Sequence, residues 1–202
     1  MKNTKVVIIG GGTFNHISCH LALAAPAFGT TARQLAKIYQ GHGVDVELVL
    51  TKMADHTSKI VTNEDLARKL VEIADDPDVD VVVMNAAVCD FSLDSPSEDA
   101  RLSSSEDYPV MLRGVQGKFV KEFKRLRPDV VVVGFKTTSG AEWTTQLAKA
   151  AMSLESNGLD IVLANDVGTK NNMVLTREGR FEQMSRESCL SFIASESLDL
   201  LA

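Results

Sequence analysis

The stretch VVIIGGGTFNHISCHLALAAPAFGTTARQLA, residues Val6–Ala36, carries the features that decide the fold. It opens with Val6–Ile9, a β-branched run typical of a strand that is covered on both faces. Gly10–Thr13 follows at once, where nucleotide-binding proteins place a phosphate-binding turn. Such a turn normally leads directly into a helix, but about sixteen residues precede the helical pattern that begins at Thr30 or Thr31. The stretch therefore predicts a nucleotide-binding protein with an unusual first connection.

Composition limits the classes to which the protein can belong. The 202 residues are 45% hydrophobic and 24% charged, which predicts one globular domain over residues 1–202 with a sizeable core. A net charge of -6 argues against a nucleic-acid partner but allows a small anionic ligand. No apolar run approaches the roughly 18 residues that span a bilayer, so no membrane partner is expected. Cys19, Cys89 and Cys189 are odd in number and widely spaced, which favours a reducing, cytoplasmic setting.

Strand and helix patterns alternate along most of the chain, which predicts an α/β fold with a mainly parallel sheet and helices on both faces. The predicted strands cover residues 6–9, 44–50, 79–84, 130–135 and 161–164. Helices are predicted over residues 30–40, from a start at 62–65, over 118–126 and over 142–154. The chain is predicted to end with a β-hairpin, residues 173–175 paired with 180–184, and a helix over residues 187–200. Together these elements predict a three-layer, Rossmann-like fold.

One segment departs from the alternation. Residues 91–107 are rich in Ser, Asp, Glu and Pro and predict a long exposed loop, followed by a short strand at 109–112. In a sheet of this kind, ligands bind at the carboxyl ends of the strands. That rule selects four segments with small or polar residues: Gly10–Thr13, Asn85–Phe91, Phe135–Ser139 and Asn165–Gly168.

Several common motifs do not fit. In the dinucleotide-binding pattern G-x-G-x-x-G, Asn15 stands at the position of the third glycine. The second predicted strand ends in Leu48–Lys52, which lacks the acidic residue that would bind a ribose hydroxyl. An NAD(P)-binding enzyme is therefore the least favoured of the functions considered. No P-loop and no G-x-S-x-G nucleophile motif is present. His16 and His20 lie in a predicted loop and read as polar loop residues. The basic stretch Lys118–Arg127 favours a solvated helix face over a nucleic-acid site.

Four motifs occur together and in order along nearly the whole chain. Gly11-Gly12-Thr13 resembles a Gly-Gly/Pro-Thr turn, and NAAVCDF at Asn85–Phe91 resembles an AAV-x-D-F/Y signature. Val133–Lys136 is similar to a VGF strand end, and Ala164–Val167 reads ANDV. In this order the motifs resemble the phosphopantothenate–cysteine ligase family, the synthetase step of coenzyme A biosynthesis.

The resemblance implies a reaction and its partners. The family joins 4'-phosphopantothenate and cysteine through an acyl-nucleotide intermediate, with CTP or ATP as cosubstrate and Mg²⁺. In many bacteria the domain is fused behind a flavin-dependent decarboxylase, so no flavin is expected here. The family site is shared across a homodimer, and the apolar stretch Leu21–Phe28 is expected to be buried against a partner subunit.

The resemblance also implies roles for particular residues. Asp90 and Arg101 would be catalytic, with Asp90 holding Mg²⁺ or a substrate hydroxyl or amide; the metal ligands are otherwise unassigned. The residues that the resemblance assigns to nucleotide and phosphate binding are Gly11, Gly12, Thr13, Ala86, Phe135 and Lys149. Substrate binding falls on Ala87, Asp90, Asn165 and Asp166. Each position has a structural alternative: Asp90 can cap a turn, Arg101 and Lys149 can be solvated charges, and Phe135 can be core.

The segment after the glycines departs from the family. Aligning Thr13 with the family's Thr places Ala25 on the catalytic Asn and Ala27-Phe28 on two serines. Ser153 stands where the family has a further nucleotide-binding Lys. Three hypotheses remain open: a ligase that recruits another residue such as Asn15 or His16, a nucleotide-binding relative with altered chemistry, and a non-enzymatic binding or regulatory protein.

Overall fold

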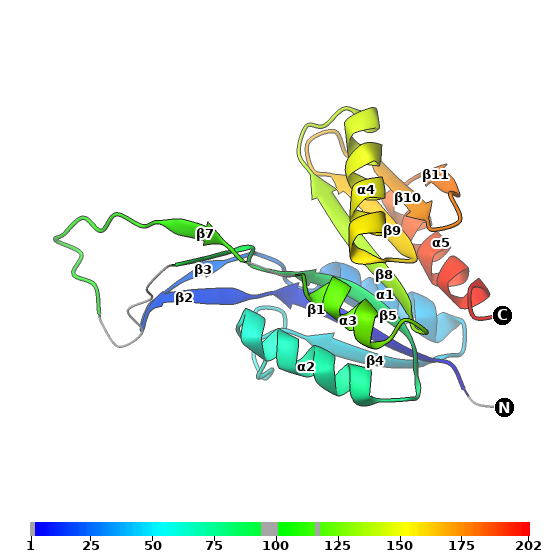
Figure 1. Cartoon of the computed structure of the whole chain (residues 1–202), viewed down its shortest axis with the longest axis horizontal. Helices are drawn as coiled ribbons and strands as arrows, with labels where there is room; N and C mark the ends of the chain where they lie inside the picture. The colour runs from blue at the N-terminus through cyan, green and yellow to red at the C-terminus, as the bar shows by residue number, and fades with distance from the viewer. Residues whose placement is uncertain (1–2, 94–100, 116–117) are drawn as a thin grey trace.

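The computed structural model describes residues 3–93, 101–115 and 118–202. Within these residues, the main sheet has seven strands (Figure 1). In spatial order they are β11 (Phe181–Gln183), β10 (Asn172–Thr176), β9 (Ile161–Asp166), β8 (Val131–Thr138), β5 (Val79–Ala87), β1 (Lys5–Gly12) and β4 (Asp45–Leu50). The strands from β9 to β4 pair in parallel, whereas β10 and β11 form the antiparallel hairpin. The predicted mainly parallel sheet with a terminal hairpin is confirmed.

Helices cover both faces of this sheet. They are α1 (Thr30–Gly41), α2 (Asn63–Asp75), α3 (Phe119–Leu126), α4 (Trp143–Asn157) and α5 (Arg186–Asp199). The alternation of side chains along β1 shows the layering: Val6 and Ile8 pack in the core with α1 and α5, whereas Val7 and Ile9 pack with α2, α3 and α4. All four are fully buried. The fold is therefore the predicted three-layer, Rossmann-like one.

The glycines do not end the first strand. β1 continues through Gly12, beyond the predicted end at Ile9, and Gly12 N donates a hydrogen bond of 2.8 Å to Ala27 O. A Cβ at position 12 would lie 1.9 Å from Ala25 O, so only glycine allows the following segment to approach this closely. The triple glycine thus permits close backbone packing within the sheet.

The delayed helix also has a structural explanation. Residues Phe14–Ser18 (β2) and Leu21–Ala24 (β3) form an antiparallel ribbon, so the predicted loop is wrong over these residues. A second ribbon pairs β6 (Phe91–Leu93) with β7 (Leu112–Gly114), a later strand than the one predicted at 109–112. Both ribbons project from the same end of the sheet (Figure 1). Alternation was hard to detect because polar and apolar residues are mixed in these short strands.

The side chain of Asn15 links the two ribbons. Asn15 on β2 donates from Nδ2 to Phe91 O at 2.6 Å and to Cys89 O at 3.2 Å. Residues 94–100, within the predicted exposed loop, lie outside the described residues. Among the helices that the structure describes, none has the length and apolar character needed to span a membrane.

Candidate functional site

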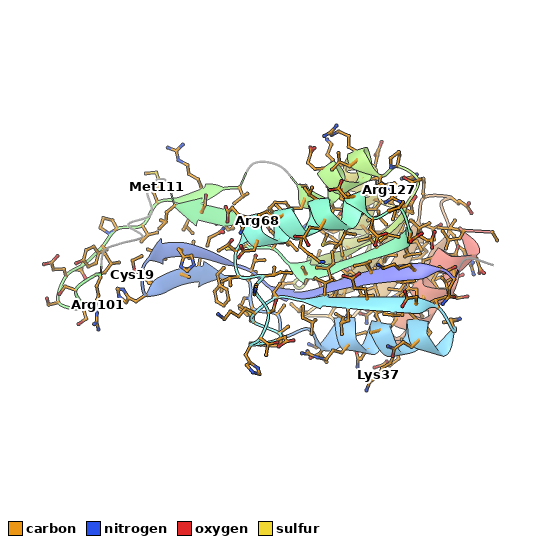
Figure 2. All side chains as sticks on the ribbon, turned by 90° about the horizontal axis from the view of Figure 1, so that it is seen from below. Cys19, Lys37, Arg68, Arg101, Met111 and Arg127 are labelled. Atoms are coloured by element: carbon orange, nitrogen blue, oxygen red, sulfur yellow. The ribbon has the colours of Figure 1, made fainter. Side chains whose placement is uncertain are left out.

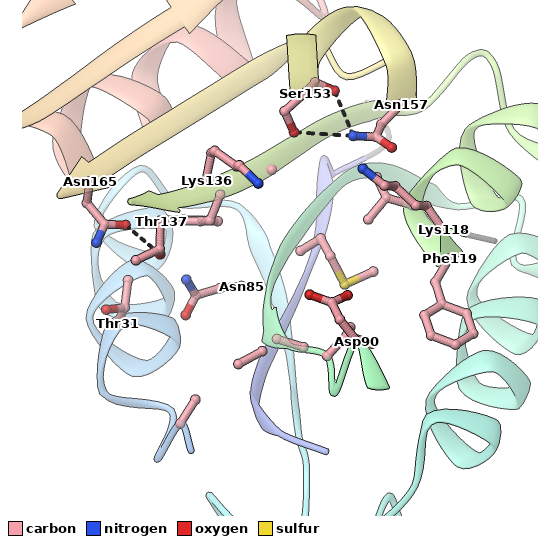
Figure 3. Close-up of a pocket in the computed structure, with 18 of the residues that line it drawn as sticks. Thr31, Asn85, Asp90, Lys118, Phe119, Lys136, Thr137, Ser153, Asn157 and Asn165 are labelled. Carbon is pink, nitrogen blue, oxygen red and sulfur yellow. Dashed lines mark hydrogen bonds between the residues drawn. The ribbon is translucent and has the colours of Figure 1, made fainter. Parts of the chain in front are cut away.

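A cavity of about 650 Å³ opens at the carboxyl ends of the central parallel strands (Figure 3). Its floor comes from the ends of β5 and β8 and from Asn165 on β9. The starts of α1, α3 and α5 and the last turns of α4 supply its walls. This is where an open parallel sheet places its ligand. The geometry brings the segments beginning at Asn85 and Phe135 together in one site.

The charges around this cavity are unbalanced in favour of cations. Among the described lining residues, Lys118, Lys136 and Arg186 are basic and Asp90 alone is acidic, in a chain of net charge -6. Figure 3 shows the Lys136 and Lys118 side chains directed into the cavity. Arg186 donates from Nη2 to Thr31 Oγ1 at 2.8 Å, which fixes the guanidinium at the rim. Such an arrangement is suited to an anionic, phosphate-bearing ligand.

Five of the sequence-predicted site residues line this cavity. They are Ala86, Ala87, Asp90, Phe135 and Asn165. Ala86 and Ala87 end β5, Asp90 comes three residues later, and Phe135 lies on the neighbouring strand β8. Small side chains at positions 86 and 87 leave room for a ligand against the strand end. Asn165 accepts a hydrogen bond of 3.2 Å from Thr137, so its carboxamide is already oriented.

The predicted anion-binding turn occupies a different place. Thr13 is fully buried and lies outside the described lining of the cavity. Its Oγ1 donates to Asn63 Oδ1 at 2.6 Å and accepts from Cys89 N at 2.9 Å, while its own N donates to Ala87 O. With the Gly12 N–H also bonded to Ala27 O, the geometry of Gly11–Thr13 favours a supporting role: it holds the β5 end and the rim of the cavity.

Asp166 also lies outside the described lining of the cavity. It is buried and accepts hydrogen bonds from both loops beside it. The donors are Thr169 N, Gly168 N, Gly140 N, Ala141 N and Thr138 Oγ1. These bonds, that from the Thr169 N–H foremost, hold the pKa of the Asp166 carboxyl well below its usual range. Its geometry is that of a loop organiser behind the site.

Two predicted cationic residues lie apart from the cavity. Lys149 is exposed on α4, outside the described lining, whereas Ser153 and Asn157 on the same helix do line it. Asn157 donates from Nδ2 to Ser153 O at 2.7 Å. Figure 2 shows Arg101 at the outer end of the ribbons, away from the body of the sheet. Within one subunit the structure does not bring Arg101 to Asp90.

The cations that do line the cavity were missed as site residues. Lys136 follows Phe135 directly, so the strand-end rule already contained the signal that identifies it. Lys118 and Arg186 come from the starts of two helices that are distant in sequence. Their convergence is a tertiary property, and no local pattern marks it.

The fold and cavity define a Rossmann-like α/β protein in which Lys118, Lys136 and Arg186 line the cavity at the strand ends. Residues 1–192 match the family described as DNA/pantothenate metabolism flavoprotein C-terminal domain, and the chain belongs to this family. The coenzyme A biosynthesis bifunctional protein CoaBC of Methanocaldococcus jannaschii is 25% identical over 171 residues. That match covers 82% of this chain and 41% of the relative, so the chain spans less than half of the relative's length.

Solved structures agree on the fold. The DNA/pantothenate metabolism flavoprotein from Streptococcus pneumoniae superposes with a TM-score of 0.82 at 18% identity, covering 98% of this chain and 100% of that chain. A Cab2 mutant in complex with phosphopantothenate-cysteine gives a TM-score of 0.70 at 15% identity, covering 98% and 86%. The family match over residues 1–192 confirms the resemblance expected from the four sequence motifs, and these structures confirm the fold.

Proposed function

We propose that this chain is a ligase that joins a phosphopantothenate-type acid to cysteine through an acyl-nucleotide, with CTP or ATP as cosubstrate. The observation that carries the proposal is the cation-lined cavity at the strand ends of a domain of this family. The bifunctional CoaBC relative and the Cab2 complex support the choice of substrates. A cytoplasmic site of action is part of the proposal, supported by the odd number and wide spacing of Cys19, Cys89 and Cys189.

The first half-reaction needs positioning and charge neutralisation. A carboxylate oxygen of the acid attacks the α-phosphorus, and the bond to the departing pyrophosphate breaks. Lys118, Lys136 and Arg186 would bind the phosphate oxygens and stabilise the charge that develops on them. The ring of Phe135 is placed to pack against the base at the strand end.

Mg²⁺ fits this site through one carboxylate. Asp90 is exposed at the cavity and its side chain forms no hydrogen bond with the described residues. Magnesium in nucleotide sites is commonly held by one or two carboxylates together with the substrate phosphates. Asp90 would hold the ion, which supplies further charge neutralisation when bound.

In the second half-reaction, the cysteine nitrogen attacks the acyl carbon and the nucleoside monophosphate departs. The two residues considered as substitutes for the missing Asn are poorly placed for this step. The Asn15 carboxamide is engaged in joining the ribbons, and His16 is exposed on β2; both lie outside the described lining. Ala25 offers no polar group, so this step depends on another group of the cavity.

A homodimer is part of the proposal. Large apolar side chains are exposed along both ribbons, where a monomer would leave them in water. They include Leu21, Phe91, Met111 and Leu112. Pairing of the ribbons with a second copy would cover these side chains and carry Arg101 toward the partner subunit.

A nucleotide-binding relative with altered chemistry is the second candidate. The positions of Lys149 and Arg101 outside the cavity favour it, together with Ala25. The experiment that separates the candidates incubates the protein with CTP or ATP, Mg²⁺ and 4'-phosphopantothenate, with and without cysteine. We expect pyrophosphate release and, with cysteine, amide formation. Pyrophosphate without amide would support the second candidate, and calorimetry without nucleotide binding would refute both.

A further inference from the structure

Among the carboxamides that line the described part of the cavity, Asn85 differs from its neighbours. Asn165 is held through its oxygen, which accepts from Thr137 Oγ1, and Asn157 is held through its nitrogen, which donates to Ser153. The Asn85 side chain has no hydrogen-bond partner among the described residues, although it is half-buried. A half-buried carboxamide without a protein partner is available to a ligand through both its N–H donors and its oxygen acceptor.

The backbone holds Asn85 at a fixed place. It lies near the end of β5, where it pairs in register with Gly10 of β1, and the preceding Met84 pairs with Gly134 of β8. A short side chain on a central strand has few χ1 rotamers, so the carboxamide stays close to the strand end. In the view of Figure 3, the carboxamide projects into the cavity between Thr31 and Asp90.

No other group of this kind comes from the neighbouring segment. Residues Leu21–Phe28, whose last part lines the cavity rim, contain no polar side chain. The lysines of the cavity are suited to phosphate oxygens, and Asp90 can only accept hydrogen bonds when it is ionised. Asn85 is therefore placed to donate a neutral N–H to an uncharged oxygen of a ligand.

We infer that the Asn85 carboxamide is a catalytic residue that donates a hydrogen bond to the acyl oxygen of the bound acid. This inference rests on the proposed function. When the amine nitrogen adds to the acyl carbon, the carbonyl π electrons move onto this oxygen, and the Asn85 Nδ2–H stabilises the negative charge. The carbonyl then re-forms, the C–O bond to the nucleotide breaks, and the amine proton passes to solvent. The nucleoside monophosphate departs with the bonding electron pair.

The expected loss of rate without the Asn85 carboxamide can be estimated from hydrogen-bond donors that stabilise oxyanions in other enzymes. Removal of one preorganised donor to a developing oxyanion costs about 10²–10³ in rate. The acyl oxygen gains less charge while the carboxylate attacks phosphorus, so the first half-reaction depends less on this donor. Because the side chain has no protein partner, its removal leaves no group of the fold unsatisfied.

The test compares Asn85→Ala and the near-isosteric, uncharged Asn85→Leu with wild type. Gln183→Ala, which removes an exposed carboxamide on β11, is the matched control. With CTP or ATP, Mg²⁺ and 4'-phosphopantothenate, the two Asn85 variants should release pyrophosphate at a single-turnover rate within about tenfold of the wild-type rate. They should then accumulate the acyl-nucleotide, whereas the control variant should behave as wild type. Addition of cysteine should yield amide about 10²-fold or more slowly, with the unfolding midpoint and nucleotide Kd unchanged.

Three results would overturn the inference. Amide formation within about threefold of wild type in both variants would show that Asn85 is not needed. Equal losses in pyrophosphate release, nucleotide affinity and unfolding midpoint would assign Asn85 a structural role. A wild-type protein that neither releases pyrophosphate nor forms amide would refute the proposed function, and the inference with it. The first two results leave the proposed function standing, so the failures are distinguishable.

Discussion

Replacement of Lys118 and Lys136 together by glutamine is expected to weaken binding of the Mg²⁺-bound nucleoside triphosphate by about 10²-fold. The two ammonium groups point into the cavity from different elements, one before α3 and one on β8. A hydrogen bond to a charged group contributes about 1.5–3 kcal/mol to binding. Because Lys118 is exposed and its charge is screened by solvent, its contribution should lie at or below the lower limit of this range. Titration calorimetry at two salt concentrations measures the loss.

The matched control for this experiment is Lys37→Gln, which removes an exposed cation from α1 on the outside of the molecule (Figure 2). Its nucleotide affinity should equal that of wild type. The difference between the double variant and wild type should shrink at high salt, because screening weakens charge interactions in a solvated cavity. An unchanged affinity in the double variant would show that the phosphates bind elsewhere.

Asp166→Asn is expected to lower the unfolding midpoint by about 5 °C or more while leaving nucleotide affinity in place. The carboxylate accepts hydrogen bonds on both oxygens, and an amide would direct N–H groups at Ala141 N–H and Thr138. The loops around Gly140 and Gly168 would lose their common acceptor. Thermal unfolding followed by circular dichroism measures the change, with exposed Asp45→Asn as the control.

The pH dependence of this effect has a definite sign. The pKa of Asp166 is lowered in the folded protein, so its contribution is complete above the unfolded-state value of about 3.9. The contribution is lost as pH falls from about 4 toward the folded pKa. Wild type should therefore lose stability over this range more steeply than Asp166→Asn. Parallel curves of stability against pH for wild type and Asp166→Asn would contradict the role of Asp166 in holding the loops. A large loss of substrate affinity in Asp166→Asn without a lower unfolding midpoint would instead support the predicted substrate-binding role.

The sheet was predictable because its strands carry their own signal. Runs such as Val81–Met84 and Val130–Phe135 are continuous and free of polar side chains, as burial on both faces requires. The α2 start was equally local: Thr62 and Asp65 form a capping box, with each side chain bonded to the other's backbone. The ribbons were missed because short strands of mixed polarity are defined by their cross-strand partners.

The site was predictable to the extent that it follows from strand ends. The rule that ligands bind at the carboxyl ends of strands selects Asp90, Phe135 and Asn165 from the sequence alone, and all three line the cavity. It also selected Asp166, because adjacent residues on a strand point in opposite directions and the sequence did not distinguish them. Lys118 and Arg186 reach the cavity only through the packing of α3 and α5 on the sheet, a long-range property.

The central claim is that the acid is activated as an acyl-nucleotide in this cavity. The most direct measurement uses 4'-phosphopantothenate with ¹⁸O in its carboxylate, together with CTP or ATP, Mg²⁺ and cysteine. Attack on the α-phosphorus predicts nucleoside monophosphate that carries one ¹⁸O, detected by mass spectrometry, alongside unlabelled pyrophosphate. Labelled inorganic phosphate with nucleoside diphosphate, or amide formation without label in the monophosphate, would contradict the account.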